Sequence, residues 1–458
     1  MSIASELTTL AANKAAIKAA IEAKNPSTMP TDVLSQWTTS IASIPSGGGH
    51  EGWIYGYVID ESDSNPATRV TYIEDNAGFN PLYMDFANDA LVWGDWRDFV
   101  EEYFRPAMLK SDGTIDYYLD PNDLTKKVDG VTASDVANTS YDGNAMLIVK
   151  PIYYSCHRIS PTKLQVRFSN IKQDSSFVNW THLKNDGSVA EFCGWPLFTG
   201  SVVSSKLRSI ATGSVPNGNG ANFATDYARA TANGANWYTT TFADEVMIRL
   251  LFPLLCKSTD SQGCIGGGAS HSSAPYLRCG QLSDKGYFWG HSEVTTTTPH
   301  GSKFLCMENV WGELWRKPCG IVAIGNSLYT KMTPSMVDGS SYDGFLAGNN
   351  AADYVAKYVK AGWRGPYANA YNGYTISSIS DDCAAPTWPR ALVSTSPQYT
   401  THYCDMGYLT GGSDPVICVF GGSCANAAYS CGIYAVDASL DVTTNYWAYA
   451  PSLSYHFY

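Results

Sequence analysis

Charged side chains are scarce in this sequence of 458 residues, and positive charge is the scarcer sign. Asp, Glu, Lys and Arg make up 16% of the chain, and 30 Lys and Arg stand against 42 Asp and Glu, giving a formal net charge of −12. Such a chain offers no basic stripe for nucleic acid or for an anionic membrane surface. We therefore expect no nucleic acid among its partners, whereas a neutral sugar or a protein is compatible with this charge.

Long apolar runs are also missing. No stretch is long and apolar enough to cross a bilayer, so we expect no membrane insertion. Residues 1–20 are interrupted by Glu6, Lys14 and Lys18 and lack the apolar centre of a secretory signal. Synthesis in a reducing cytoplasm is therefore expected, with the 12 cysteines as free and mostly buried thiols. Their even number leaves disulfides open as the alternative.

Motifs that hold metals or phosphates are absent as well. No two cysteines form a CxxC pair, which argues against structural zinc. The aspartates at 112–129 lack the ligand order of an EF-hand, so we interpret them as solvated turn residues. The glycines at 266–268 are not followed by the Lys-Ser/Thr pair of a phosphate-binding loop. We therefore expect no metal site and no other cofactor.

Glycine, proline and tyrosine are abundant, with 40, 22 and 30 residues. This composition predicts an α+β chain that is mostly β and rich in turns. Residues 3–24 carry Ile and Leu at alternating spacings of three and four, which predicts an N-terminal helical segment with a coiled-coil seam. A frayed helix docked on its own chain is the alternative. We expect four parts: a helical attachment or oligomerisation segment at 1–45, a glycine-rich linker at 46–51, a small β-rich spacer domain at 52–140, and a larger domain at 141–458.

Three internal segments predict helices, one of them at residues 221–233. Residues 90–103 place aromatic and apolar side chains at helical spacing, and residues 244–255 are almost wholly apolar. A helix as apolar as the one at 244–255 more often packs on a sheet than binds a ligand.

The C-terminal tail, residues 417–458, contains no Lys, Arg or Glu, and its carboxylates are those of Asp437 and Asp441. It is crowded with Tyr, Trp, Ser, Asn and Ala. Tyr, Ser and Asn are typical of contact surfaces such as antibody loops, because Tyr provides contact area at little entropic cost. A buried β-core with tyrosine hydroxyls at its rim explains the same composition. Core and contact surface are therefore both open interpretations of the tail.

Several stretches elsewhere occur together with motifs in the tail. They are YDGNAM at 141–146, LRSIATG at 207–213, ANGANW at 232–237, ENVWG at 308–312 with Trp315, and the closing Gly421-Gly422-Ser423, Gly432 and Leu453-Ser454-Tyr455. Together they resemble phage tail proteins with a C-terminal C-type-lectin-like domain. Many of those are variable proteins of diversity-generating retroelements, the group that includes the phage major tropism determinant. The resemblance covers residues 52–458.

The resemblance implies a C-type-lectin-like fold for residues 141–458. In the family, Glu-Asn-x-Trp-Gly belongs to the core signature, so Glu308, Asn309, Trp311 and Gly312 are expected to be structural. Gly421, Gly422 and Leu453 would frame the sheet of the variable tail. The triplets of calcium-dependent lectins, Glu-Pro-Asn and Trp-Asn-Asp, do not occur, so recognition would not need calcium.

In the family, tail residues between the framing positions face the ligand and vary through adenines in their codons, which suits this composition. By this resemblance the candidate ligand-binding residues are Asn426, Tyr429, Ile433, Tyr434, Asp437, Ser439, Asp441, Tyr446, Trp447 and Tyr449.

The function that the resemblance implies is that of a receptor-binding protein at the tip of a phage tail fibre. The protein would be made in the host cytoplasm and carried on the virion. Its N-terminus would attach to other phage tail proteins, its expected state is a homotrimer, and its partner in host adsorption is a bacterial surface receptor, either protein or glycan.

Catalysis is not expected, because no motif pairs the available acids as glycoside hydrolysis requires. The acids considered are Glu191, Asp226, Asp244, Glu245, Glu293 and Glu313. A tail-associated hydrolase of capsule or cell-wall polymer and a purely structural fibre subunit are the alternatives.

Overall fold

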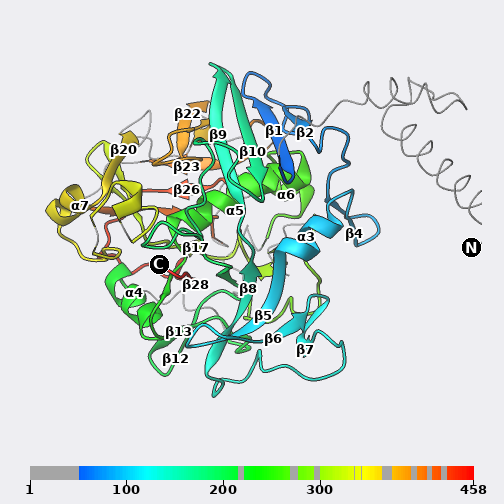
Figure 1. The fold of residues 1–458 in the computed structure, drawn as a ribbon, viewed down its shortest axis with the longest axis vertical. Helices are drawn as coiled ribbons and strands as arrows, with labels where there is room; N and C mark the ends of the chain where they lie inside the picture. Colours follow the sequence, from blue (N-terminus) through cyan, green and yellow to red (C-terminus); the bar gives the residue numbers. More distant parts are fainter. Residues whose placement is uncertain are drawn as a thin grey trace, which may run out of the picture. The chain divides into compact units, whose positions relative to one another are not determined.

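The computed structural model describes residues 51–214, 221–268, 277–292, 300–334, 336–341, 343–363, 374–393, 400–409, 415–423 and 431–458. The chain divides into two units, Met1–Ile54 and Tyr55–Tyr458, and Figure 1 shows the helices and strands of the second. The helical segment expected at 1–45, with its coiled-coil seam at 3–24, and the linker at 46–51, apart from Glu51, lie outside the described residues. In the second unit, the prediction of a mostly β chain is confirmed.

One seven-stranded sheet joins the middle of the chain to its C-terminus. Its strand order is β14 (Trp237–Thr239), β28 (Leu453–Tyr455), β11 (Cys193–Pro196), β8 (Gly143–Val149), β5 (Phe104–Lys110), β6 (Ile115–Asp120) and β7 (Asp123–Lys127). Strands β5 and β8 pair along their whole length. The boundary expected near residue 140 therefore does not separate two units, because backbone hydrogen bonds cross it throughout this pair.

A second seven-stranded sheet is built largely from the last third of the chain. Its order is β22 (Pro389–Val393), β21 (Tyr374–Ile379), β23 (Met406–Tyr408), β26 (Val436–Asp437), β25 (Val419–Phe420), β17 (Trp315–Arg316) and β27 (Tyr449–Ala450). A four-stranded sheet has the order β20 (Val359–Trp363), β19 (Ser327–Thr330), β18 (Ile321–Ile324) and β24 (Val416–Ile417).

The remaining strands form one more four-stranded sheet and three hairpins. The sheet has the order β2 (Val70–Glu74), β1 (Ile54–Asp60), β10 (Lys163–Ser169) and β9 (Tyr153–Ser160). The hairpins are β3 (Tyr83–Asp85) with β4 (Ala90–Val92), β12 (Ser201–Val203) with β13 (Lys206–Arg208), and β15 (Lys303–Phe304) with β16 (Met307–Glu308).

Helices in the described part of the chain are mostly short. They are α3 (Arg97–Tyr103), α4 (Phe223–Thr231), α5 (Phe242–Cys256), α6 (Ser261–Cys264), α7 (Ala351–Lys357) and the 3₁₀-helix η1 (Met336–Asp338). The single helix expected at 90–103 is wrong, because β4 and α3 divide this segment. Gly94 between them adopts a left-handed φ of +55°, and Asp95 accepts a hydrogen bond from the Asn80 backbone at 2.7 Å. Both features turn the chain where a helix would have to continue.

Helix α5 confirms the helix expected at 244–255. Its N-terminus is a capping box in which the side chains of Thr241 and Asp244 satisfy each other's backbone N–H groups. Its C-terminus is marked by Lys257 in the left-handed conformation, with φ of 51°. Every residue of α5 is buried, so the helix is an interior element of this unit (Figure 1).

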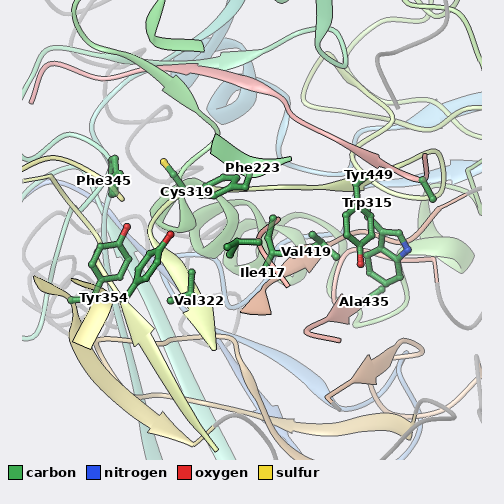
Figure 2. Packing of buried hydrophobic residues seen from close by; sticks show 13 residues of the cluster. Phe223, Trp315, Cys319, Val322, Phe345, Tyr354, Ile417, Val419, Ala435 and Tyr449 are labelled. Carbon is green, nitrogen blue, oxygen red and sulfur yellow. The ribbon is translucent and has the colours of Figure 1, made fainter. Parts of the chain in front are cut away.

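The tail contributes heavily to the hydrophobic core. Figure 2 shows one buried cluster in which tail residues Ile417, Val419, Ala435 and Tyr449 pack with residues from earlier elements, Trp315 among them. Leu453 and Tyr455 of β28 belong to a second buried cluster. The core interpretation of the tail is therefore correct for most of its described side chains.

Two further expectations concern the whole chain. The cysteines among the described residues are free, and most are buried, as expected. No helix within the described ranges is long and apolar enough to span a membrane.

Candidate functional site

The exposed part of the described tail is the loop that leads from β26 to β27. Val442 anchors it from below, because its side chain is 3% exposed and its backbone N–H donates to the Pro415 carbonyl at 3.1 Å. Asp441 accepts hydrogen bonds from the backbone N–H and the hydroxyl of Thr443. These bonds lower the pKa of the Asp441 carboxyl, with the Thr443 hydroxyl as the largest cause. The loop therefore starts from a fixed, ionised turn.

Tyr446 and Trp447 form the aromatic part of this loop. They are 36% and 38% exposed, and their ring centroids lie 5.8 Å apart. Tyr446 also meets the buried ring of Tyr449 edge-on at 5.0 Å, and its carbonyl accepts the Tyr449 N–H at 3.1 Å. Partial burial raises the pKa of Tyr446, and the nearby carboxylate of Asp437 adds to the effect. We name residues 441–447 the tail loop; it presents two large rings from an anchored backbone.

The structure brings half of the predicted residues to this region. Tyr446 and Trp447 are exposed, whereas Asp437, Ser439 and Asp441 are half-buried nearby in the sequence. Asn426 and Tyr429 lie outside the described residues. Ile433, Tyr434 and Tyr449 lie in the interior, with at most 2% of each exposed. The expectation that these last three side chains face outward is therefore not met.

Tyr434 is held inside by helix α5. Pro253 has no N–H, so the carbonyl of Arg249, four residues earlier, loses its usual helical donor. The Tyr434 hydroxyl donates to that oxygen at 3.1 Å. Its neighbour Ile433 is fully buried, and the Ile433 N–H donates to the Ser261 hydroxyl at 3.1 Å. Both residues thus complete the surroundings of α5 and α6.

Tyr449 is held inside by sheet pairing. In β27 it lies opposite Trp315 of the parallel strand β17, and Figure 2 shows the two rings in the same cluster. Burial raises the pKa of Tyr449 well above its ordinary value. Because its ring supports Tyr446 from below, Tyr449 acts on the loop through packing.

Thr443 and Asn445 are exposed loop residues that the sequence reasoning did not select. The signal for them was present: Asp441 starts a polar run, Thr-Thr-Asn, directly before the aromatic pair. Such a run is typical of a turn, and turns carry exposed side chains.

Cys193, Asp244 and His456 are the one group among the described residues that could hold a metal ion. Their possible ligand atoms lie within 4.8 Å of one another. All three are buried. The His456 ring contacts the Thr181 carbonyl through Nδ1 at 2.9 Å and the Asp244 carboxylate through Nε2 at 3.0 Å. Both nitrogens of the ring are therefore engaged by neighbouring oxygen atoms. Burial acts to raise the pKa of Asp244, but His456 and Thr241 outweigh it, and the pKa is lowered. The hydrogen bonds of Asp244 to His456 and to the Thr241 N–H therefore tie the C-terminal strand region to the start of α5.

Four of the five aspartates at 112–129 stabilise their own turns, whereas Asp116 accepts from the Tyr141 hydroxyl at 2.9 Å. Asp112, Asp120, Asp123 and Asp129 each accept a hydrogen bond from a backbone N–H two residues ahead. This is the Asx-turn arrangement, which agrees with their interpretation as turn residues.

Most acids considered for catalysis are engaged in interior contacts. Asp226 pairs with Lys317, and Glu245 pairs with Arg316 through two contacts at 2.9 Å and 2.5 Å. Glu191 is exposed, and Glu293 lies outside the described residues. A carboxylate held in a buried ion pair is not placed to attack a polymer, so these contacts favour a structural role.

Glu308 and Glu313 are buried carboxyl groups whose pKa is raised towards neutral pH. Glu308 accepts from the backbone of Gly280 at 2.9 Å and Leu282 at 2.8 Å, and burial raises its pKa to about 7. Glu313 accepts from the Leu277 N–H at 2.8 Å, and burial raises its pKa to about 8. The cavity beside Glu308 has a volume of about 20 Å³, which suits a single water molecule rather than a polymer.

The surrounding motif is interior too. Glu308, Asn309, Trp311 and Gly312 are all buried, and the Trp311 indole donates to the Gly266 carbonyl at 2.8 Å. Their expected structural role is confirmed.

A scan against known protein families finds no match for this chain, and a search of curated proteins finds none either.

Proposed function

We propose that this chain is a receptor-binding protein of a phage tail fibre, and that its tail loop contacts a bacterial surface molecule. The observation that carries the proposal is the exposed pair Tyr446 and Trp447 on an anchored loop. The motifs that resemble retroelement variable proteins support it from the sequence side.

The loop has the physical properties of a binding surface. Tyr and Trp are enriched among residues that dominate binding energy, because large rigid rings lose little entropy on contact. The hydrogen bond that the Thr443 N–H donates to Asp441 and the buried side chain of Val442 fix the loop before a ligand binds. This lowers the entropic cost of ordering the loop on binding. The exposed residues from Thr443 to Trp447 carry no charge, so the loop suits an uncharged patch of protein or glycan.

The finer features of the proposal follow the resemblance. Residues 141–458 would adopt a C-type-lectin-like arrangement, with the tail as its diversified surface. The N-terminal segment would form a coiled coil, attach the protein to other tail proteins of the virion and assemble a homotrimer. Three copies would add avidity to weak single contacts. The protein would bind without catalysis, which is supported by the interior pairing of Asp226, Asp244 and Glu245.

Adsorption of the purified, labelled full chain to a panel of bacterial strains tests the proposal. The double variant Tyr446→Ala with Trp447→Ala should lose about tenfold or more in apparent affinity for a strain that the parent binds. The control is Ile159→Ala, which removes an apolar side chain that is 50% exposed outside the tail. Unchanged adsorption by the folded double variant would refute the role of the tail loop.

Two further measurements separate the alternatives. Release of shortened chains from host polysaccharide incubated with the protein would favour the hydrolase. A neighbouring reverse transcriptase gene, with a template repeat that differs from the tail codons at adenines, would support diversification.

A further inference from the structure

A second concave site lies outside the tail. It is a cleft of about 330 Å³ between the β3–β4 hairpin, the turn that joins β6 to β7, and the segment 284–289. This volume is at the lower end of small-ligand pockets, about 300 to 1,000 Å³. None of the described tail residues lines it. We name it the Trp93–Trp289 cleft after the two half-buried tryptophans in its wall.

The aromatic wall is rigid. Buried Tyr287 and Phe288 meet Trp93 edge-on, with centroid distances of 5.8 Å and 5.7 Å. The backbone of Trp289 exchanges two hydrogen bonds with Lys303, at 3.1 Å and 2.7 Å. The Trp289 indole donates to the Asp89 carboxylate at 3.3 Å. Both tryptophans are therefore oriented before any ligand binds.

The rim of the cleft is polar and carries both donors and acceptors. Asp89, Asp284 and Asn122 are exposed, and Lys285 lies beside them. Asp89 adopts a left-handed φ of +48° in the turn of the β3–β4 hairpin, a conformation that Asp tolerates in turns. The same residue accepts the hydrogen bond from the Trp289 indole, so the turn fixes the carboxylate that orients this ring.

Cations already lie over the tryptophan rings. The Lys285 ammonium is 5.2 Å from the centroid of Trp289, and the Arg97 guanidinium is 5.8 Å from that of Trp93. A cationic ligand would have to displace one of them. An anionic ligand would meet two carboxylates, those of Asp89 and Asp284, against one lining ammonium. A wholly apolar ligand would desolvate these carboxylates without replacing their hydrogen bonds.

From these constraints we infer that the Trp93–Trp289 cleft binds an uncharged saccharide. A sugar ring has an apolar C–H face that packs on an aromatic ring, and hydroxyl groups that both donate and accept. The carboxylates of Asp89 and Asp284 accept from such hydroxyls, whereas Lys285 and Asn122 donate to them. The inference is independent of the proposed receptor-binding role of the tail loop, because the two sites share no residue.

Saturation-transfer NMR on the full chain tests this inference with named probes. The uncharged probes are glucose, galactose, N-acetylglucosamine and maltose, and the charged probes are glucuronate and glucosamine. At least one uncharged sugar should bind with a dissociation constant of about 1 mM, within about tenfold either way. Trp289→Ala should weaken that binding about tenfold or more.

Two variants complete the experiment. Asp284→Ala removes an exposed carboxylate and tests the cleft even if Trp289→Ala does not fold; it should weaken binding severalfold. Trp447→Ala removes an exposed tryptophan from the tail loop and should leave sugar binding unchanged. The inference is overturned if none of the uncharged sugars binds, if a charged probe binds best, if Asp284→Ala binds like the parent, or if Trp447→Ala alone abolishes binding.

Discussion

Replacing Trp447 or Tyr449 by alanine distinguishes an exposed side chain of the tail from one that supports its fold. The two aromatic residues are two positions apart, yet 38% of Trp447 is exposed against 2% of Tyr449. Tyr449 packs in the cluster of Figure 2 and pairs with Trp315 across β27 and β17. We expect the two variants to differ in stability far more than their chemistry suggests.

The expected magnitudes follow from burial. Truncating a fully buried aromatic ring costs about 3 to 5 kcal/mol, the sum of lost transfer free energy and the cavity left behind. That cost is a large share of the total stability of a folded domain, about 5 to 15 kcal/mol. Trp447→Ala should cost about 1 kcal/mol or less, because water already reaches much of the ring. Tyr449→Phe keeps the ring and removes the hydroxyl that is hydrogen-bonded to the Asp437 carboxylate. It should cost about 1 kcal/mol, the value of a typical lost hydrogen bond.

Urea denaturation followed by circular dichroism measures these differences. The midpoint for Tyr449→Ala should fall well below that of the parent, with a similar slope, whereas Trp447→Ala and Tyr449→Phe should stay close to the parent. Equal loss in Trp447→Ala and Tyr449→Ala, or an unchanged midpoint for Tyr449→Ala, would refute the assignment of Tyr449 to the scaffold.

Two further predictions concern the interior. Burial raises the pKa of Glu313 from its ordinary value of 4.5 to about 8. Between these two pH values the unfolded chain releases a proton that the folded chain keeps. The contribution of Glu313 to stability is therefore complete below pH 4.5 and is lost as the pH rises towards 8. The free energy of unfolding of Glu313→Gln, relative to the parent, should therefore rise between pH 5 and pH 8 by up to about 1.4 kcal/mol per pH unit; an equal difference at both values would contradict the raised pKa. Gly421→Ala should destabilise by about 1 to 3 kcal/mol, because Gly421 has φ of +92° and an added Cβ would lie 2.7 Å from the Val310 carbonyl oxygen. Its control is Gly348→Ala, where an added Cβ meets nothing within 4 Å, and similar thermal midpoints for both variants would count against this account of Gly421.

Several features could be predicted from the sequence because their causes are local. The almost wholly apolar run at 244–255 predicted α5, because the side chains that make a helix apolar lie close together in the chain. Turn residues and aromatic content predicted a mostly β chain. The Asp441-Val-Thr-Thr-Asn run marks a turn, and Tyr446 and Trp447 follow it directly. Both aromatic residues were among the candidates, but they were chosen from the family resemblance and not from this turn.

Other features could not be predicted, because their causes are distant in the chain. The boundary expected near residue 140 is crossed by the pairing of β5 with β8. The sequence of one strand does not determine which other strand it pairs with or in which register. The Trp93–Trp289 cleft likewise needs three segments, around residues 89, 122 and 285, to meet.

The tail shows both cases together. Its sequence by itself determined a composition of aromatic, small and uncharged residues that suits a core and a contact surface equally. Tertiary structure alone decided between these for each side chain. Tyr434 is interior because a proline 181 residues earlier leaves the Arg249 carbonyl, 185 residues away, without its helical donor. Tyr446 and Trp447 remain 36% and 38% exposed, on the stretch of chain between β26 and β27 that the buried side chains of Val442 and Tyr449 anchor. Burial is a property of contacts between distant segments, so a tyrosine's place in the sequence does not reveal which side of the sheet it faces.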